Sequence, residues 1–401
     1  MKSSRYLLPD SRWLLPLLAA LVALGPLSVD VYLPAMPIIM EELDTDIQRM
    51  HLTLTTYLAG FAVFHLVCGP LADRYGRKPI LIIGTVLFVF ACIGCASAST
   101  VEALMLFRFL QGIGACVGPT LARAIARDVF GPTRAARALS VIALLMALAP
   151  AVAPTLGGLM LLWLPWPSIF ILLAVYGIIT VGLIHVFLAE SLPVRQSLHP
   201  VAIARNFRLL FRSRIFLVAT FASGMIYAGL LTYLSSSSFV YIQMMGVPVE
   251  HFGFIFLTSV IGYMVGSALS ARLARHCDSE LTVLLGAVLI AVAVGIMWAG
   301  TYFYPDSLPV LVLPMMLYAT GMGLVLPNAM AIALRPFPGI AGTASAMLGF
   351  IQMALSAGAT ALVGKYLVDT PQPMLDFMLM ISLSALILAV WLYCLHKRIG
   401  H

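Results

Sequence analysis

Residues 69–79 join two long apolar runs, at about 51–72 and 79–99, and have the sequence Gly69-Pro70-Leu71-Ala72-Asp73-Arg74-Tyr75-Gly76-Arg77-Lys78-Pro79. Each run holds the roughly 20 apolar residues that a helix needs to cross a hydrocarbon core of about 30 Å. We expect Gly69 to permit a close helix contact, Gly76 to turn the chain and Pro79 to suit a helix start. Asp73 ends its own helix, where the dipole disfavours an anion, so it should find a basic neighbour or another helix's N-terminus. A simple charged anchor between two spans, the alternative, would not require so many constrained positions.

Apolar runs of this length recur along the whole chain. Of the 401 residues, 62% are hydrophobic and 10% charged, whereas a soluble domain carries about 25% charged and 45–50% apolar residues. This composition excludes a water-soluble globule. The first run is too long for a cleaved signal peptide and is better interpreted as a span. Hydropathy predicts twelve spans: 13–40, 51–72, 79–99, 103–126, 138–162, 168–189, 215–243, 252–274, 281–303, 309–333, 341–368 and 375–395.

The charged residues divide between the two predicted faces of the membrane. If both termini are cytoplasmic, all of the 23 basic residues lie in inner segments, except for Arg49, Arg108 and Lys365. Acidic residues show the opposite bias and concentrate at or near the outer face: Glu41, Glu42, Asp44, Asp46, Glu102, Glu250, Asp306, Asp369 and Asp376. This distribution follows the positive-inside rule. The net charge of +7 therefore reports topology, and no nucleic-acid partner is expected.

The longest internal connection divides the predicted spans into six and six. We expect an N-terminal half over residues 1–189, a cytoplasmic linker over 190–214 and a C-terminal half over 215–401. The arginines of the linker predict a surface segment near anionic lipid. The sequences of the two halves show only a faint repeat, so the division depends on span count and loop position.

Asp30 and Arg108 are the two charged residues that lie deepest in the first half. An Asp within a translocated helix costs about 2.5–3.5 kcal/mol, and a permanently charged arginine is tolerated there only with a partner, a polar cavity or a protonated acid. A carboxyl group held between burial and a nearby cation can load and release a proton as its cavity changes sides. We therefore interpret Asp30 as a proton carrier with Arg108 beside it; a structural ion pair or an interfacial acid is the alternative.

Two further helix faces combine polar, small and helix-bending residues. Arg108 is followed at helical spacing by Gln111, Gly112 and Ala115, a seam that could equally hold the helix bundle together. In the fifth predicted span one face carries Pro150, Pro154, Gly157 and Gly158, which suits either a bending element or a close helix contact.

Polar residues elsewhere in the spans are candidates for a substrate path, because transporter substrates bind near the bilayer midplane between repeats. Each could instead satisfy backbone carbonyls or lie at an interface. The candidates are Tyr32, Tyr57, Tyr233, Ser236, Asn328 and Gln352. We expect His65 to be packed or interfacial, with a proton role as the alternative, and Lys365 to extend its ammonium toward the interface.

Five segments carry a resemblance to a known transporter family. Residues 69–79 resemble the signature loop of the major facilitator superfamily, and residues 104–114 resemble its fourth-helix motif through Leu104, Arg108, Gln111, Gly112 and Gly114. The chain is most similar to the twelve-span drug/proton antiporters, and among them to the bicyclomycin and chloramphenicol resistance (Bcr/CflA) branch. Residues 30–34 resemble that branch's first-helix acid motif, and 338–346 its tenth-to-eleventh helix connection. Residues 153–158 resemble the fifth-helix antiporter motif, with Ala-Pro in place of the usual Gly-Pro.

The resemblance implies an all-α membrane protein of twelve helices in two halves that works by alternating access. Proton entry would drive export of a small, often amphipathic drug or metabolite. By motif, Asp30 would be the protonation site and Arg108 would tune it. Asp73 would brace the outward-open state, against the start of the eleventh helix near Gly342. The expected setting is the bacterial inner membrane, with both termini cytoplasmic and the protein a monomer.

Other functions remain as alternatives. The same scaffold could serve a proton symporter or a facilitator that takes up a small metabolite. An enzyme would need a nucleophile with its base or a metal cluster, and the sequence contains no HExxH, GxSxG or phosphate-cradling loop. Cys92 and Cys95 have CxxC spacing but lie in an apolar run without a second pair, so we expect neither metal nor cofactor. A channel should show a filter-like segment, and we find none.

Overall fold

The computed structural model describes residues 13–192 and 200–399; of residues 127, 131–149, 200–203 and 399, only the backbone is described. Contacts divide the chain into two compact units: one of Met1–Thr45 and Thr56–Pro200, the other of Asp46–Thr55 and Val201–His401. The predictions for Lys2, Arg5, Arg12 and Arg195, and for the side chains of Arg127, Arg134 and Arg137, lie outside the described residues.

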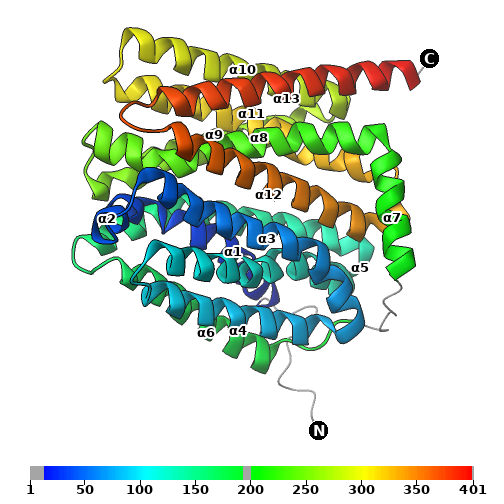
Figure 1. Cartoon of the computed structure of the whole chain (residues 1–401). Helices are drawn as coiled ribbons and strands as arrows, with labels where there is room; N and C mark the ends of the chain where they lie inside the picture. Colours follow the sequence, from blue (N-terminus) through cyan, green and yellow to red (C-terminus); the bar gives the residue numbers. More distant parts are fainter. Residues whose placement is uncertain (1–12, 193–199, 400–401) are drawn as a thin grey trace. The chain divides into compact units, whose positions relative to one another are not determined.

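Helices and short connections make up the described chain, without a strand among these residues (Figure 1). The helices that belong largely to the first unit are α1 (Leu14–Asp30), α2 (Met36–Glu42), α3 (Ile47–Tyr75), α4 (Arg77–Ala96), α5 (Val101–Leu161) and α6 (Pro167–Phe187), with a 3₁₀ turn, η1 (Leu33–Ala35), between α1 and α2. The second unit contains α7 (Pro200–Arg212), α8 (Arg214–Ser238), the π-helical η2 (Phe239–Met244), α9 (Val249–Leu273), α10 (Ser279–Phe303), α11 (Leu308–Leu334), the 3₁₀ turn η3 (Pro338–Ile340), α12 (Ala341–Tyr366) and α13 (Gln372–Ile399).

The described residues include eleven helices that are long and apolar enough to cross a membrane. Of the predicted fifth span, 138–162, residues Pro150–Leu161 at the end of α5 are described with their side chains, and they form an apolar helix. The contacts of α5 show that the chain turns back on itself between Gly118 and Gly157. A Cβ at Gly118 would meet the Leu21 carbonyl, whereas one at Gly157 would meet the Val31 carbonyl, although a straight helix would separate these glycines by about 60 Å. The chain therefore passes along α1 twice.

Small residues let helices approach closely within each unit. In the first unit a Cβ at Gly112 would collide with the Tyr57 carbonyl, and one at Gly60 with the Phe109 carbonyl, so α3 and α5 touch at both positions. In the second unit Gly266 of α9 lies in the same way against the Thr320 carbonyl of α11. Close backbone approach at small residues is how helices associate in lipid.

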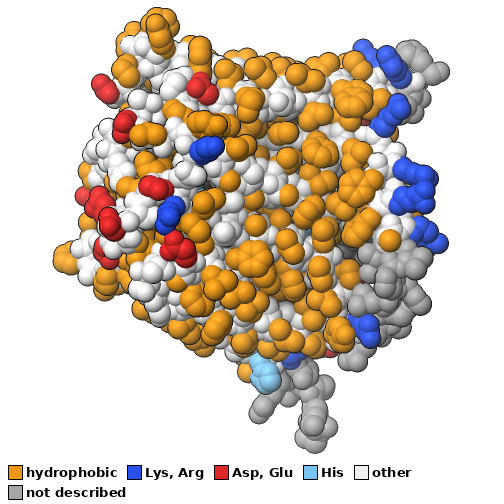
Figure 2. Space-filling model, viewed as in Figure 1, with side chains coloured by type: hydrophobic (Ala, Val, Ile, Leu, Met, Phe, Trp, Pro, Cys, Tyr) orange, Lys and Arg blue, Asp and Glu red, His pale blue; other side chains and the backbone are white. Residues whose placement is uncertain are grey.

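The outward faces of the helices are apolar, and charged side chains gather at the helix ends (Figure 2). Exposed large hydrophobic residues occur in both units; Phe90, Ile178, Val265 and Ile387 are examples. Such a surface would be unfavourable in water but matches the hydrocarbon interior of a bilayer.

Candidate functional site

Asp30 is the last residue of α1, and the helix gives way to η1 directly after it. Pro34 and Pro37 follow within seven residues, and proline removes backbone donors that a continuous helix needs. The Asp30 side chain is buried, with 5% of its surface exposed. Non-helical backbone at membrane depth is tolerated where it is enclosed by protein or lines a cavity. The span thus breaks at its buried acid.

Arg108, on α5, lies fully buried between two tyrosine rings. Its guanidinium carbon is 4.3 Å from the centre of the Tyr32 ring and 4.5 Å from that of Tyr57. The Tyr57 hydroxyl donates a hydrogen bond to the Gly25 carbonyl at 3.0 Å, which ties the ring to α1. Desolvated cation–π contacts of this kind stabilise a guanidinium by about 2 kcal/mol each. Arg108 is therefore held by aromatic faces in a place from which water is excluded.

Two hydrogen bonds complete the contacts of Arg108, and both use Nη1. This atom donates to the Ser28 carbonyl at 3.0 Å and to Gln111 Oε1 at 2.6 Å. Gln111 in turn donates from Nε2 to Cys92 Sγ at 3.1 Å. Among the described residues, Nε and Nη2 of Arg108 find no acceptor. Buried donors without acceptors are costly, by about 1–3 kcal/mol for a neutral group and more for a charged one.

The structure brings Asp30 and Arg108 to the same region but not into an ion pair. Ser28 and Tyr32, the residues two before and two after Asp30, both contact Arg108. None of the ion pairs between described residues involves Asp30. The alternative of a structural ion pair is therefore not seen among the described residues, because a carbonyl, an amide and two rings surround the cation.

The turn between α3 and α4 has the expected backbone and ion pairing. Gly76 has a φ of 109°, a conformation that side chains disfavour. Asp73 finds its basic neighbour in Arg77, with Oδ1 2.7 Å from Nη2, and Arg77 Nε lies 3.3 Å from Asp128 Oδ2 near the middle of α5. Arg74 lies over the ring of Tyr75. The close contact expected at Gly69 is wrong for this structure, since a Cβ there would meet no atom of the described residues within 4 Å.

Glu190, which is not among the residues predicted to be functional, caps this turn. Its two carboxylate oxygens accept from the backbone N–H of Arg77 at 3.0 Å and of Lys78 at 3.2 Å. These donors belong to the first turn of α4 and have no partner inside the helix. Lys78 also donates from Nζ to the His185 carbonyl at 2.9 Å. The sequence does carry one indication of this role: Glu190 is an acidic residue on the predicted inner face, where acidic residues are rare.

The small-residue face of the predicted fifth span makes a close contact. A Cβ at Gly157 would overlap the Val31 carbonyl and lie 2.9 Å from Pro34 Cγ. Pro154 and Gly158 are also buried, and Pro150 is partly buried. Of the two interpretations, the geometry at Gly157 favours close packing against the break that follows Asp30.

Three of the four candidates for a substrate path in the second unit form hydrogen bonds with neighbouring side chains. Tyr233 shares a 2.9 Å hydrogen bond with the hydroxyl of Tyr241 in η2, and both rings are buried. Asn328 donates to Ser270 at 2.7 Å, and Gln352 to Ser223 at 3.3 Å. Buried Ser236 Oγ has no acceptor or donor among the described residues.

His65 is packed inside the protein and Lys365 is exposed. His65 is buried beside Phe61, with ring centres 5.8 Å apart, as expected of a packed histidine. Lys365 is exposed, and its ammonium lies 5.8 Å from the centre of the Tyr366 ring. The interfacial position of Lys365 stays a prediction.

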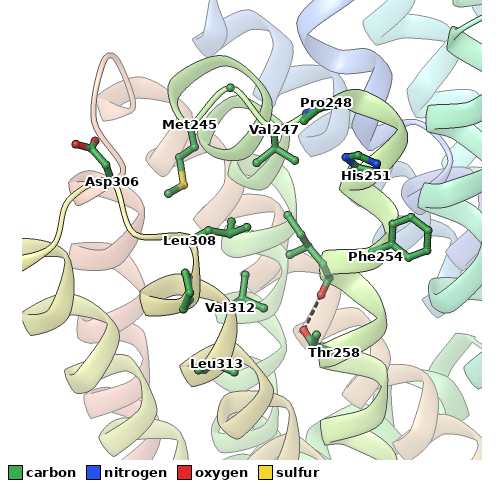
Figure 3. Close-up of a pocket in the computed structure, with 13 residues that line it drawn as sticks. Met245, Val247, Pro248, His251, Phe254, Thr258, Asp306, Leu308, Val312 and Leu313 are labelled. Carbon is green, nitrogen blue, oxygen red and sulfur yellow. Dashed lines mark hydrogen bonds between the residues drawn. The ribbon is translucent and has the colours of Figure 1, made fainter.

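The second unit also carries an apolar groove of about 780 Å³ between the start of α9 and the start of α11 (Figure 3). Val247, Leu308 and Val312 line it, and Thr258 closes one side with its hydroxyl bonded to the Ile255 carbonyl at 2.6 Å. The lining is mainly hydrophobic and contains none of the residues predicted to form a substrate path.

The eleven long apolar helices in the described part of the chain define the class of helical, multi-pass membrane proteins. The sequence profile of the Major Facilitator Superfamily matches residues 18–360, so the chain belongs to this family. It is 31% identical to a bicyclomycin resistance protein homolog of Haemophilus influenzae over 89% of this chain and 90% of that protein. It is likewise 31% identical to the multidrug resistance protein MdtL of Vibrio parahaemolyticus, over 84% and 85% of the two chains.

Solved structures agree on the fold. The crystal structure of a D-xylose-proton symporter superposes with a TM-score of 0.74 at 14% identity, covering 94% of this chain and 97% of that one. That of the human organic anion transporter MFSD10 has a TM-score of 0.71 at 19% identity, covering 94% and 99%. The predicted fold class and family are confirmed. The protein is a membrane transporter with a small-molecule substrate and is not an enzyme.

Proposed function

We propose that the protein is a proton-coupled exporter of small amphipathic compounds and works by alternating access. The observation that carries the proposal is a buried guanidinium with two unused donors, set against the segment that holds a buried acid. The names of the relatives, which refer to bicyclomycin and multidrug resistance, support export of drug-like molecules. We further infer that both termini are cytoplasmic in a bacterial inner membrane, that residues 1–189 and 215–401 act as the two moving halves, and that a monomer suffices.

The chemistry of the Arg108 site supports exchange of a proton at Asp30. With Asp30 neutral, the guanidinium can remain with its tyrosines and the Ser28 carbonyl. With Asp30 ionised, the unused donors at Nε and Nη2 offer a carboxylate the charge-assisted hydrogen bonds that it needs in a dry environment. Ser28 and Tyr32 already contact Arg108, so a small change at the break after α1 would bring the acid to the cation.

The energetics suit drug extrusion. One charge that moves through 100 mV is worth about 2.3 kcal/mol, and each 1.4 kcal/mol is tenfold in a concentration ratio. One net charge per cycle could therefore sustain roughly a fiftyfold gradient of substrate. Loss of the charge change at position 30 should remove this coupling.

The test compares Asp30→Asn with Asp369→Asn, an exposed acid outside the Arg108 site, at equal membrane levels. A resistance screen against a broad antibiotic panel first identifies a transported compound. In everted vesicles with an imposed proton gradient, we expect Asp30→Asn to abolish gradient-driven transport of that compound and Asp369→Asn to retain it. Full coupling in Asp30→Asn would refute the role of Asp30.

Direction is tested separately in proteoliposomes. Addition of the transported compound should release protons from the lumen in exchange for substrate. Uptake of protons together with the compound would identify a symporter instead and overturn the export proposal. Saturable flux that responds to the gradient also separates a carrier from a channel.

A further inference from the structure

Helix α7 ends one residue before a predicted membrane span. It covers Pro200–Arg212, and α8, an apolar helix long enough to cross the bilayer, begins at Arg214. Between them Ser213 is extended, with φ −87° and ψ 108°, and its hydroxyl accepts from the Phe216 N–H at 3.3 Å. The chain changes direction between α7 and α8 (Figure 1). The connection therefore places the end of α7 at the level where the span leaves the membrane.

Three exposed arginines form one face of α7. Arg205, Arg208 and Arg212 are spaced three and four residues apart, which aligns them along the helix. The sequence contains no acid between Glu190 and Glu250, and the ion pairs found within the described residues include none of the three. These cations thus present an uncompensated positive stripe.

Hydrophobic side chains flank the same stripe. Leu210 is completely buried and fixes the opposite side of the helix against the protein. Leu209 and Phe211, on either side of the arginine face by helical geometry, keep 48% and 55% of their surfaces exposed. An exposed face that combines guanidinium groups with large apolar side chains fits the boundary between phospholipid headgroups and acyl chains.

We propose that α7 is a binding surface for anionic phospholipid of the leaflet at which α8 begins. The three arginines would hold headgroup phosphates, for which the guanidinium fork supplies paired donors, while Leu209 and Phe211 contact the upper acyl chains. An acidic protein would leave these two apolar residues without a matching environment, and free phosphate would not use them. The proposal does not depend on which substrate is carried or on proton coupling.

The binding test uses the purified full-length protein in mild detergent, titrated with phosphatidylglycerol or with phosphatidylcholine. The readout is the thermal-unfolding midpoint, from which an apparent dissociation constant for each lipid follows. We expect phosphatidylglycerol to raise the midpoint more than phosphatidylcholine. Each arginine near an anionic surface strengthens binding by about fivefold. The triple variant Arg205→Gln, Arg208→Gln, Arg212→Gln should therefore weaken phosphatidylglycerol binding by about a hundredfold.

A charge-matched control removes three other exposed cations of the second unit: Arg272→Gln, Arg275→Gln, Lys397→Gln. This control should lose less than tenfold in affinity. Equal losses in the two triple variants, or no preference for the anionic lipid, would overturn the proposal. If the triple variant does not fold, the single variants at the three α7 arginines can be compared with the control in the same way, by their loss of phosphatidylglycerol affinity.

Two further arms separate lipid from other anions. Leu209→Ser with Phe211→Ser should weaken phosphatidylglycerol binding severalfold while all charges remain; an unchanged affinity would contradict contact with acyl chains. Inorganic phosphate at millimolar concentration should leave the midpoint unchanged. An increase equal to that seen with phosphatidylglycerol would show a free-anion site and would also overturn the proposal.

Discussion

The start of α4 in the first unit and the start of α10 in the second carry similar joints with opposite charges. At α4 the basic Arg77 lies between Asp73 and Asp128, and Glu190, beyond the end of α6, caps the helix. At α10 the acidic Glu280 is the buried centre. Its Oε1 is 3.1 Å from Nη1 of Arg335, at the end of α11, and 3.5 Å from Nδ1 of His396, near the end of α13. Each joint connects a helix start with the ends of two other helices in its unit.

The helix dipole makes the two joints unequal. An N-terminus carries partial positive charge, which favours Glu280 in the first turn of α10 but disfavours Arg77 and Lys78 at the start of α4. The joint at α4 therefore depends on acids supplied from elsewhere, Asp128 and Glu190. The joint at α10 has a favourable charge of its own. We therefore expect that removal of the charged partners at these joints destabilises the first unit more than the second.

The largest effect is expected for Arg77→Gln. The Arg77 side chain is 12% exposed and lies between the carboxylates of Asp73 and Asp128, so its loss removes the cation that bridges these two acids. We expect the free energy of unfolding to fall by about 2 kcal/mol, the range of hydrogen bonds to charged groups. Thermal and denaturant unfolding of the purified protein in detergent would measure it.

Arg74→Gln is the matched control for Arg77→Gln. It removes the same charge in the same turn from an exposed side chain that lies over Tyr75. Exposed substitutions usually change stability by less than about 0.5 kcal/mol. Equal losses in the two variants would mean that net charge, and not the bridging position of Arg77, governs this joint.

Local features of the α4 joint could be predicted from the sequence. Asp73 and Arg77 are one helical turn apart in sequence, and the positive φ at Gly76 is a local backbone requirement, so both expectations are met. The succession of spans could also be predicted, because the hydropathy of each span is a property of its own stretch of sequence. The exception is Gly69, because whether a small residue meets a neighbour depends on which helix lies opposite.

Features that depend on the register between distant helices could not be predicted. Glu190 caps a residue 113 positions earlier in the chain, and the joint at α10 unites three helices. The two rings that enclose Arg108 require α3, α5 and the break after α1 to be aligned to within one side chain. The choice between a proton carrier and a structural ion pair at Asp30 could not be made from the sequence, because it depends on which carbonyl, amide and aromatic groups surround Arg108.

The second prediction compares the helix caps of the two joints. Glu190→Ala removes the acceptor for two N–H groups at the start of α4, and loss of a cap typically costs about 1 kcal/mol. At α10 the N-cap residue, Asp278, makes no capping hydrogen bond and its side chain is 72% exposed. Asp278→Ala should therefore cost less than about 0.5 kcal/mol. Unfolding measurements that gave the reverse order would contradict the claim that only α4 needs an external cap.

The smallest effect is expected at the α10 joint itself. Glu280 has only 5% of its side chain exposed, whereas Arg335 is 57% exposed, so the two partners should respond differently to removal. Arg335→Gln leaves the buried carboxylate with His396 and the helix N-terminus, and we expect a loss of about 0.5–1 kcal/mol. Glu280→Gln removes the buried charge together with its desolvation cost and lets Arg335 turn to solvent, so its loss should be no larger. In the double variant the two losses should not add, because each single change already breaks the same contact. Additive losses, or a loss for Arg335→Gln as large as for Arg77→Gln, would mean that the dipole does not distinguish the two joints.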